Sequence, residues 1–122
     1  MEKRIALRLK LRKVEGSIVH HNAILARASK GKLVEGYVLC IKTACWHCWV
    51  DKDGERMDVY SQMPGAIPFE YSETIPEGYE EMVHENIDEN KRTFKLYQED
   101  QKQFWKDAPK KVREFKYGQV DR

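Results

Sequence analysis

The sequence predicts an α+β fold in which a small, mostly antiparallel sheet packs on one helix and a long C-terminal helical region follows. Three patterns predict it: strict alternation at 5–12, helical spacing of apolar residues from 18 to 30, and an Asp-Gly turn between strand-like runs. A chain of 122 residues fits one domain. We divide that domain into a sheet-and-helix core at 1–78 and a helical region at 79–122.

The first two elements are a strand and a helix. Residues 5–12, IALRLKLR, place their large apolar side chains on one face and mostly basic ones on the other, which predicts a half-buried strand with a basic outer face. The stretch IVHHNAILARASKG then predicts a helix, for which Ser17 is the N-cap and Gly31 the stop.

A hairpin follows the helix. The runs LVEGYVLCI at 33–41 and CWHCWVD at 45–51 are rich in β-branched and aromatic residues and predict two strands. The Asp-Gly pair of DKDG at 51–54 favours a tight turn into a further strand at 55–60.

The C-terminal region has helical character from 79 to 107. Residues on one face are spaced three or four apart: Val83, Ile87, Asn90, Phe94, Tyr97, Gln101 and Phe104. A small sheet cannot cover a continuous helix of this length, so we expect a homodimer or a higher homo-oligomer held by this stripe. The alternative is a pair of helices, broken near Asn90, that folds onto the sheet of the same chain. Pro109 ends the region.

Composition indicates a soluble chain that does not cross a membrane. Charged residues make up 34 % of it, the mean hydropathy is −0.75, and no apolar run approaches the roughly 20 residues of a membrane span. The charged start MEKRIALRLKLRK does not have the pattern of a secretory signal peptide. Three cysteines in such a chain predict reduced thiols and a cytoplasmic location.

Charge is segregated along the chain. Residues 1–50 hold 10 Lys and Arg against 3 Asp and Glu (+7), residues 51–100 hold 5 against 14 (−9), and residues 101–122 hold 7 against 3 (+4). Such segregation can steer a charged ligand or make two copies complementary. A nucleic-acid partner is disfavoured, because the basic residues lack interleaved aromatic residues and the middle is acidic.

The stretch ACWHCWVD at 44–51 holds two cysteines, and their spacing fits two chemistries poorly. A redox pair needs its first cysteine at a helix N-terminus, but Cys45 and Cys48 lie in a predicted strand. Zinc would need Cys40, both of these cysteines and a histidine, but strand alternation turns Cys45 and Cys48 to opposite faces. We therefore expect buried thiols and no metal or cofactor, and a zinc-stabilised interaction module stays as an alternative.

A histidine and an aspartate on paired strands are the stronger signal. His47 lies on one predicted strand and Asp58 on the next, an arrangement in which a carboxylate can orient an imidazole as a general base.

Four stretches of the sequence form an ordered pattern: VHHNA at 19–23, VEGYVL at 34–39, HCWVDKDGERMD at 47–58 and GAIPFEY at 65–71. Together they resemble a family of small bacterial and phage proteins with the motifs C-x-x-N-A, V-E-G-Y-A, H-A-W-x-x-D-x-x-G-x-x-x-D-P-T and G-I-P-F. The resemblance covers residues 17–71. It implies a core similar to that of papain-like and transglutaminase-like proteins.

In such a core a cysteine at a helix start meets a histidine and an aspartate from adjacent strands, because the helix terminus favours the thiolate. The resemblance implies that His47 is the base, that Asp58 orients it and that Asn22 lies beside them. It also implies that a cysteine at position 19 would be reactive, but this sequence has Val19 there. The Pro-Thr after the aspartate is absent too. The scaffold is therefore expected without its cysteine chemistry.

Non-enzymatic binding of a small-molecule ligand or a partner is the favoured function. Further candidates are expected around one cleft with His47 and Asp58, although only one of the two adjacent histidines can face inward and the tryptophans are alternatives: His20, His21, Asn22, and Trp46 or Trp49. Arg8 and Arg27 are candidates for holding a phosphate group of the ligand near the helix N-terminus. The phage members of the family imply a setting in host–phage conflict, in which such a protein sequesters a ligand or blocks a partner.

An enzyme is the alternative. Cys45 lies two residues before His47 on the same predicted strand face, with Cα atoms about 6.5–7 Å apart. It would replace the missing cysteine in an acyl-transfer hydrolase or amidase that uses His47 and Asp58.

Overall fold

The computed structural model describes residues 18–62, 65, 67–79, 81–82 and 87–108. In chain order its elements are α2 (Ile18–Ser29), β1 (Lys32–Cys40), β2 (Thr43–Lys52), β3 (Glu55–Met57), a 3₁₀ turn (Tyr60–Gln62), β4 (Glu70–Ser72), β5 (Glu81–Met82), α3 (Ile87–Glu99) and α4 (Gln101–Asp107). The strand predicted at 5–12, Arg8 within it and the Ser17 cap lie outside the described residues.

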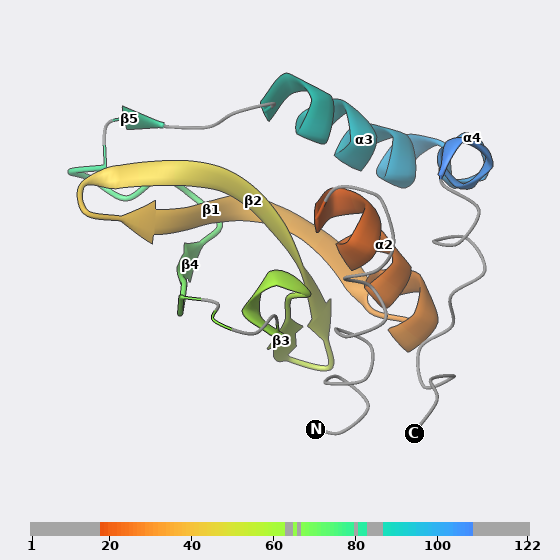
Figure 1. The fold of residues 1–122 in the computed structure, drawn as a ribbon, viewed down its shortest axis with the longest axis horizontal. Coiled ribbons are helices and arrows are strands. Elements are labelled where there is room, and N and C mark those ends of the chain that lie inside the picture. The colour runs from red at the N-terminus through yellow and green to blue at the C-terminus, as the bar shows by residue number, and fades with distance from the viewer. Residues whose placement is uncertain (1–17, 63–64, 66, 80, 83–86, 109–122) are drawn as a thin grey trace.

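The sheet has the order β3-β2-β1-β4, with antiparallel pairing throughout, and β5 adds to β2 in parallel. A long, curved β1–β2 hairpin forms its centre, and α2 lies against one face of it (Figure 1). The predicted α+β class, with a small and mostly antiparallel sheet packed on the helix at 18–30, is therefore confirmed.

The Asp-Gly turn forms as predicted, but the strand after it is shorter. Asp53 and Gly54 both have positive φ (50° and 79°), as a two-residue hairpin turn requires. β3 ends at Met57 because the side chain of Asp58 accepts a hydrogen bond from the backbone N–H of Tyr60, which turns the chain into the 3₁₀ segment.

α2 ends at Ser29, two residues before its predicted stop, and Gly31 has a different role from the one expected. The left-handed residue is Lys30 (φ 59°), and the N–H of Gly31 bonds the carbonyl of Ala26 at 2.8 Å. A Cβ at position 31 would lie 2.7 Å from Cγ1 of Val50. Gly31 is therefore needed for the close approach of the helix end to β2.

The long C-terminal helical region is the prediction that was wrong. Residues 81–82 form β5, α3 begins at Ile87, and the helix breaks at Asp100 rather than near Asn90. The carboxylate of Asp100 accepts from the N–H of Gln103 at 2.9 Å and caps a new helix, while its own N–H still bonds the carbonyl of Leu96. Ala108, which precedes Pro109, is extended, as a residue before proline prefers to be.

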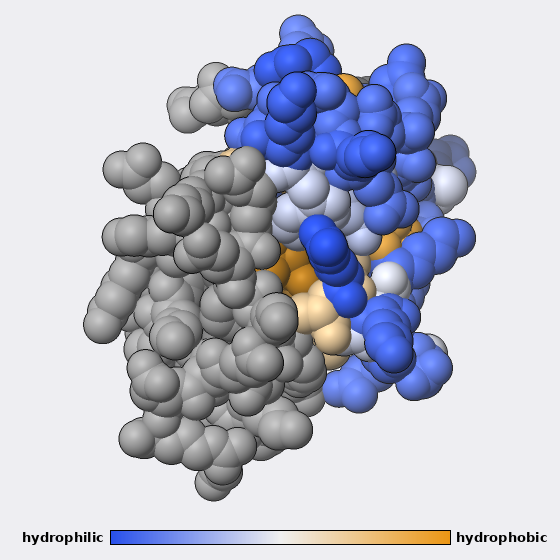
Figure 2. Space-filling view, turned by 90° about the vertical axis from the view of Figure 1, so that its right-hand side faces the viewer, coloured by the Kyte–Doolittle hydropathy of each residue, from blue (hydrophilic) through white to orange (hydrophobic). Residues whose placement is uncertain are grey.

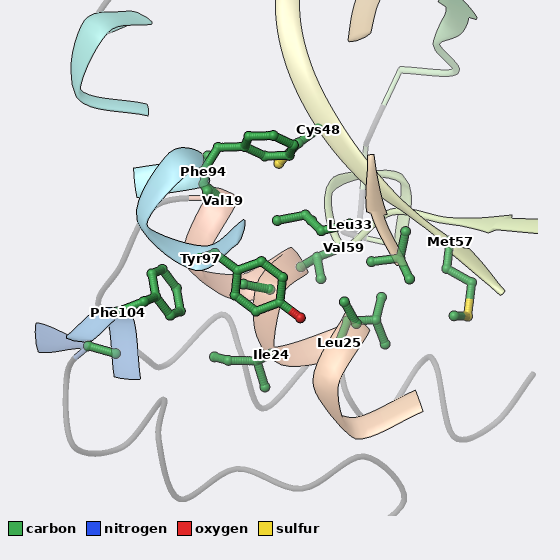
Figure 3. Close-up of a cluster of buried hydrophobic side chains, with 14 of the residues drawn as sticks. Val19, Ile24, Leu25, Leu33, Cys48, Met57, Val59, Phe94, Tyr97 and Phe104 are labelled. Carbon is green, nitrogen blue, oxygen red and sulfur yellow. The ribbon is translucent and has the colours of Figure 1, made fainter. Parts of the chain in front are cut away.

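The core lies between the sheet and the two C-terminal helices, with α2 in the middle. Seven of the twelve residues of α2 are buried, because β2 covers one side and α3 the other. Figure 3 shows side chains of α2, α3, α4 and the sheet meeting in one cluster. On the side of the molecule that Figure 2 shows, the surface of the described residues is mostly hydrophilic. A small hydrophobic strip lies there beside the residues drawn in grey.

The apolar stripe of the C-terminal region is covered within the chain. Phe94, Tyr97 and Phe104 are 4 %, 9 % and 2 % exposed in the cluster with α2. These three residues therefore do not supply a dimer interface. The homo-oligomer stays a prediction, but the apolar stripe no longer supports it. None of the helices in the described ranges is long and apolar enough to cross a membrane.

Candidate functional site

The candidate site lies where β2 lacks a neighbouring strand on its outer edge. β5 pairs with the start of β2 and β3 with its end, so residues 45–49 have no strand on that edge within the described chain. Asp58 lies in this gap, because Nδ2 of Asn22 bonds both the carbonyl of Cys48 (2.9 Å) and Oδ1 of Asp58 (3.0 Å). The side chains of Asn22 and Asp58 thus lie where a neighbouring strand would otherwise pair with β2.

The carboxylate of Asp58 is only 1 % exposed and accepts four hydrogen bonds. Oδ1 accepts from Nδ2 of Asn22 and from the N–H of Tyr60, each at 3.0 Å. Oδ2 lies 2.7 Å from Nε2 of His47 and accepts from the hydroxyl of Tyr71 at 2.7 Å. The four donors come from four separate segments, so the carboxylate joins α2, β2, the 3₁₀ turn and β4.

These donors keep Asp58 ionised. Burial on its own would raise the pKa of this carboxyl, but the hydrogen bond and charge of His47, with the hydrogen bonds from Tyr71 and Asn22, outweigh it. The pKa of Asp58 therefore lies below its ordinary value. The pKa of Tyr71 is raised, first by burial and then by the bond and charge of Asp58, so its hydroxyl stays a donor.

Asn22 connects the helix to the sheet. Besides its two donated bonds, its Oδ1 accepts from the N–H of Val59 at 2.9 Å, and the residue is fully buried. Because both amide protons and the carbonyl oxygen are bonded within the chain, Asn22 holds Asp58 in place rather than facing a cleft.

His47 is a member of this network that reaches solvent. Its side chain is 11 % exposed. Since ionised Asp58 can only accept, Nε2 carries a proton, and in the neutral form of the ring Nδ1 is an acceptor. Nδ1 forms no hydrogen bond to any residue in the described ranges. Phe69 meets the imidazole edge to face at 5.5 Å and stacks on Tyr60 at 4.3 Å, so aromatic rings border the histidine.

The register of the hairpin separates the two tryptophans. His47 pairs with Gly36, and Trp49 lies two residues further along β2, so both point to the face away from α2. A Cβ at Gly36 would collide with the indole of Trp49 and lie 2.6 Å from the carbonyl oxygen of Ser72. The glycine of VEGY therefore makes room for the tryptophan of HCW. Trp46 points to the opposite face and packs edge to face on Phe94.

The remaining predicted residues do not gather around one cleft with His47. His20 stacks on Phe104 at 5.3 Å, and burial lowers its pKa against the opposing charge of Glu89. His21 is buried. The guanidinium of Arg27 lies 4.7 Å from the ring centre of Trp105. Of the predicted set, the structure brings together His47, Asp58 and Asn22.

Position 19, where the resemblance implies a cysteine, is in the hydrophobic core. Val19 is 3 % exposed and belongs to the cluster that contains Cys48 and Phe94 (Figure 3). Cys48 faces α2, whereas His47 faces away from it. Residue 19 therefore lies on the side of the sheet opposite to the imidazole of His47.

The three cysteines form no disulfide bond with one another and differ in their surroundings. Cys40 is exposed at the end of β1, Cys45 is half-buried on the face of His47, and Cys48 is buried. Burial, and then the charge of Asp58, raise the pKa of the Cys48 thiol. Within the described ranges, no three residues of the types His, Cys, Asp and Glu are grouped so that they could hold a metal ion.

Sequence reasoning missed Tyr71, Tyr60 and Phe69. Tyr71 reaches Asp58 from the three-residue strand β4, which pairs with β1, so no periodic pattern marks it. The one available signal was the aromatic pair of GAIPFEY in the stretch that carries the resemblance.

Comparison with known proteins adds no relative: no protein-family model matches the chain, and neither a curated protein nor a solved structure matches it. The function is therefore argued from the geometry of the site.

Proposed function

We propose that this chain is a non-enzymatic binding protein whose ligand contacts His47 on the sheet face away from α2. The observation that supports this most directly is the acceptor Nδ1, which no described residue bonds, on a ring that Asp58 holds at 2.7 Å. A fixed acceptor bordered by aromatic rings is a typical polar anchor of a small-molecule site. The valine in place of a nucleophile at position 19 supports binding over catalysis.

The chemistry of the anchor limits the ligand. A neutral imidazole with a free Nδ1 accepts a hydrogen bond, so the ligand presents a hydroxyl or an N–H group together with an apolar part that packs against Phe69. A phosphate group would need a cation nearby. Of the two arginines expected for it, Arg8 lies outside the described residues and Arg27 lies on Trp105. We therefore favour an uncharged donor over a phosphate.

The setting of this function rests on the sequence. An odd number of cysteines, none paired in a disulfide, is consistent with the cytoplasmic location that we propose. The resemblance to phage proteins extends the proposal to sequestration of a ligand, or blocking of a partner, in host–phage conflict.

Native mass spectrometry of protein purified from cells tests the proposal, because it reports a bound small molecule and the oligomeric state together. We expect an added mass on the wild type that His47→Ala loses, while Cys48→Ala keeps it and loses mainly stability. Loss of the added mass in both variants, with unchanged stability, would show that the assumed strand faces are wrong. An absence of any added mass, with no change in the His47 imidazole signals when donor-bearing compounds are titrated in, would contradict the binding function.

A thiol hydrolase is the second candidate, because Cys45 shares its strand face with His47. An activated thiolate reacts with an alkylating probe far faster than an ordinary thiol at neutral pH. Fast labelling of Cys45 that His47→Ala slows would favour the enzyme. Labelling of Cys45 at the same rate in the wild type and in His47→Ala would contradict the hydrolase.

A further inference from the structure

One edge of β1 that no described strand covers lies next to a groove. All nine residues of β1 pair with β2, but β4 pairs only with residues 37–39 on the other edge, and the carbonyl of Ser72 lies beside Gly36. Residues 32–35 therefore have a strand on one edge and, in the described part of the chain, none on the other. Backbone N–H and C=O groups of alternate residues point outward along such an edge.

A side-chain turn ends β4 at this point. The backbone N–H of Thr74 donates to Oγ of Ser72 at 3.3 Å, and that hydroxyl donates to the carbonyl of Thr74. This local turn directs the chain away from β1 after Ser72. A cavity of about 380 Å³ remains along the edge, bordered by residues 32–35, Asp51 and Glu73 from the sheet side and by Phe94 and Gln98 of α3.

The two sides of this groove differ chemically. Leu33 and Glu35 point to the side of α2 and α3, where Leu33 belongs to the same apolar cluster as Phe94. Lys32 and Asp51 are a cross-strand pair on the opposite side, so the ammonium and that carboxylate offset each other. Glu73 and Glu35 add two carboxylates that no described residue pairs in an ion pair. The groove is therefore acidic.

We propose that the edge of β1 at residues 32–35 binds an extended segment of a partner protein, which adds as a strand and alternates apolar with basic side chains. Backbone hydrogen bonds along the edge supply affinity, and alternate side chains of the added strand reach the two sides. The apolar set packs toward Leu33 and Phe94, and the basic set meets Glu73 at the border of the groove. Charges on a strand edge disfavour addition of a purely apolar or acidic strand.

Fluorescence anisotropy with the full chain and a labelled eight-residue peptide of alternating leucine and lysine tests this. We expect saturable binding that Glu73→Lys weakens by about tenfold or more, because it replaces an attraction with a repulsion in the groove. Glu77→Lys is the matched control, since Glu77 is exposed and does not border the groove, and it should change the affinity less than about twofold, the effect of diffuse charge alone. Thermal unfolding confirms that both variants are folded.

A second peptide separates strand addition from charge attraction. Methylation of alternate backbone nitrogens removes the N–H donors but keeps every charge, so this peptide should not bind measurably. Equal affinity of the methylated peptide, or an equal effect of the two lysine variants, would overturn the proposal. Dimers of the peptide-free protein that Glu73→Lys dissociates in sedimentation would also overturn it, because the occupant would then be a second copy. Tighter peptide binding by a full-length variant whose residues 5–12 are replaced with glycine and serine would overturn it too, because the occupant would then be the strand predicted there.

Discussion

Nε2 of His47 lies 2.7 Å from Oδ2 of Asp58, and this bond joins a partly exposed histidine to the charged centre of a buried network. The same carboxylate anchors α2 through Asn22 and the 3₁₀ turn through the N–H of Tyr60. Orientation of the imidazole and attachment of the helix to the sheet therefore both depend on the side chain of Asp58. The first three predictions concern this carboxylate and two of the side chains that donate to it.

Acid should destabilise the protein through Asp58. Its pKa is lower in the folded chain than in the unfolded chain, so its contribution to stability is complete above the unfolded pKa, about 3.9. That contribution is lost as pH falls through the folded value. Urea unfolding from pH 7 to pH 3 should show a loss of free energy of unfolding below about pH 4 that is smaller in Asp58→Asn. Parallel curves for the two proteins would contradict this.

Asn22→Ala should cost stability rather than only binding. It leaves the N–H of Val59 and the carbonyl of Cys48 without their partner in a buried place, which costs about 1–3 kcal/mol for each unpaired group. Chemical denaturation measures the difference. Asn90→Ala, in α3 and half-exposed, is the control and should change the free energy of unfolding by less than about 0.5 kcal/mol. Similar costs for both variants would show that the three bonds of Asn22 contribute little.

Tyr71→Phe should loosen His47 without unfolding the protein. The hydroxyl donates to the oxygen that His47 also contacts, and its loss should cost about 1–1.5 kcal/mol of unfolding free energy. Ultraviolet titration gives a second readout: one tyrosine of the wild type should resist ionisation above pH 10, since burial and then Asp58 raise its pKa, and this tyrosine should be missing in the variant. Tyr60→Phe is the control, because Tyr60 contributes a backbone N–H that the change retains.

Gly36→Ala should be strongly destabilising, since the new Cβ would collide with Trp49 and approach the carbonyl of Ser72 to 2.6 Å. Overpacking of this kind costs about 1–3 kcal/mol. The cost should be smaller in a Trp49→Phe background, whose shorter ring leaves part of the space. A double-mutant cycle of unfolding free energies measures this coupling, and strictly additive costs would mean that the two side chains do not meet.

In the Val19→Cys variant, the new thiol should react slowly with an alkylating probe. The resemblance implies a reactive cysteine there, but the structure places residue 19 in the core beside Cys48, on the side of the sheet that His47 does not face. Burial in apolar surroundings raises a thiol pKa. Alkylation at neutral pH, in a background with Cys40→Ser and Cys45→Ser, should proceed no faster than at Cys48. Faster labelling of the new thiol would instead support the papain-like geometry.

The pairing of His47 with Asp58 could be predicted because it is local. An Asp-Gly turn fixes the register of a hairpin, so a histidine before it and an aspartate after it meet. The contribution of Tyr71 could not be predicted, since it depends on a short strand that adds to the far side of β1. The two tryptophans are predicted as alternatives for one cleft, although strand alternation already turns Trp46 and Trp49 apart and places Trp49 on the face of His47.

The C-terminal helices show why a correct spacing can predict the wrong element. The three-four pattern continues through Asp100, because Tyr97 before the break and Phe104 after it both pack into the core and contact each other at 5.3 Å. The pattern therefore records burial and not continuity. The signal for the break was the Asp100 cap, whose side chain accepts from the N–H three residues later.

The placement of Asp58 limits which substitutions a chain of this kind tolerates during evolution. Two of the four groups on its carboxylate belong to the attachment of the helix and the turn, and would be needed in a protein with no chemistry at all. A substitution that removes this aspartate would be eliminated for instability before any loss of activity could matter. An oriented His–Asp pair can thus be retained for stability alone, whether or not the chain catalyses a reaction. Its presence in a sequence therefore does not by itself indicate an enzyme.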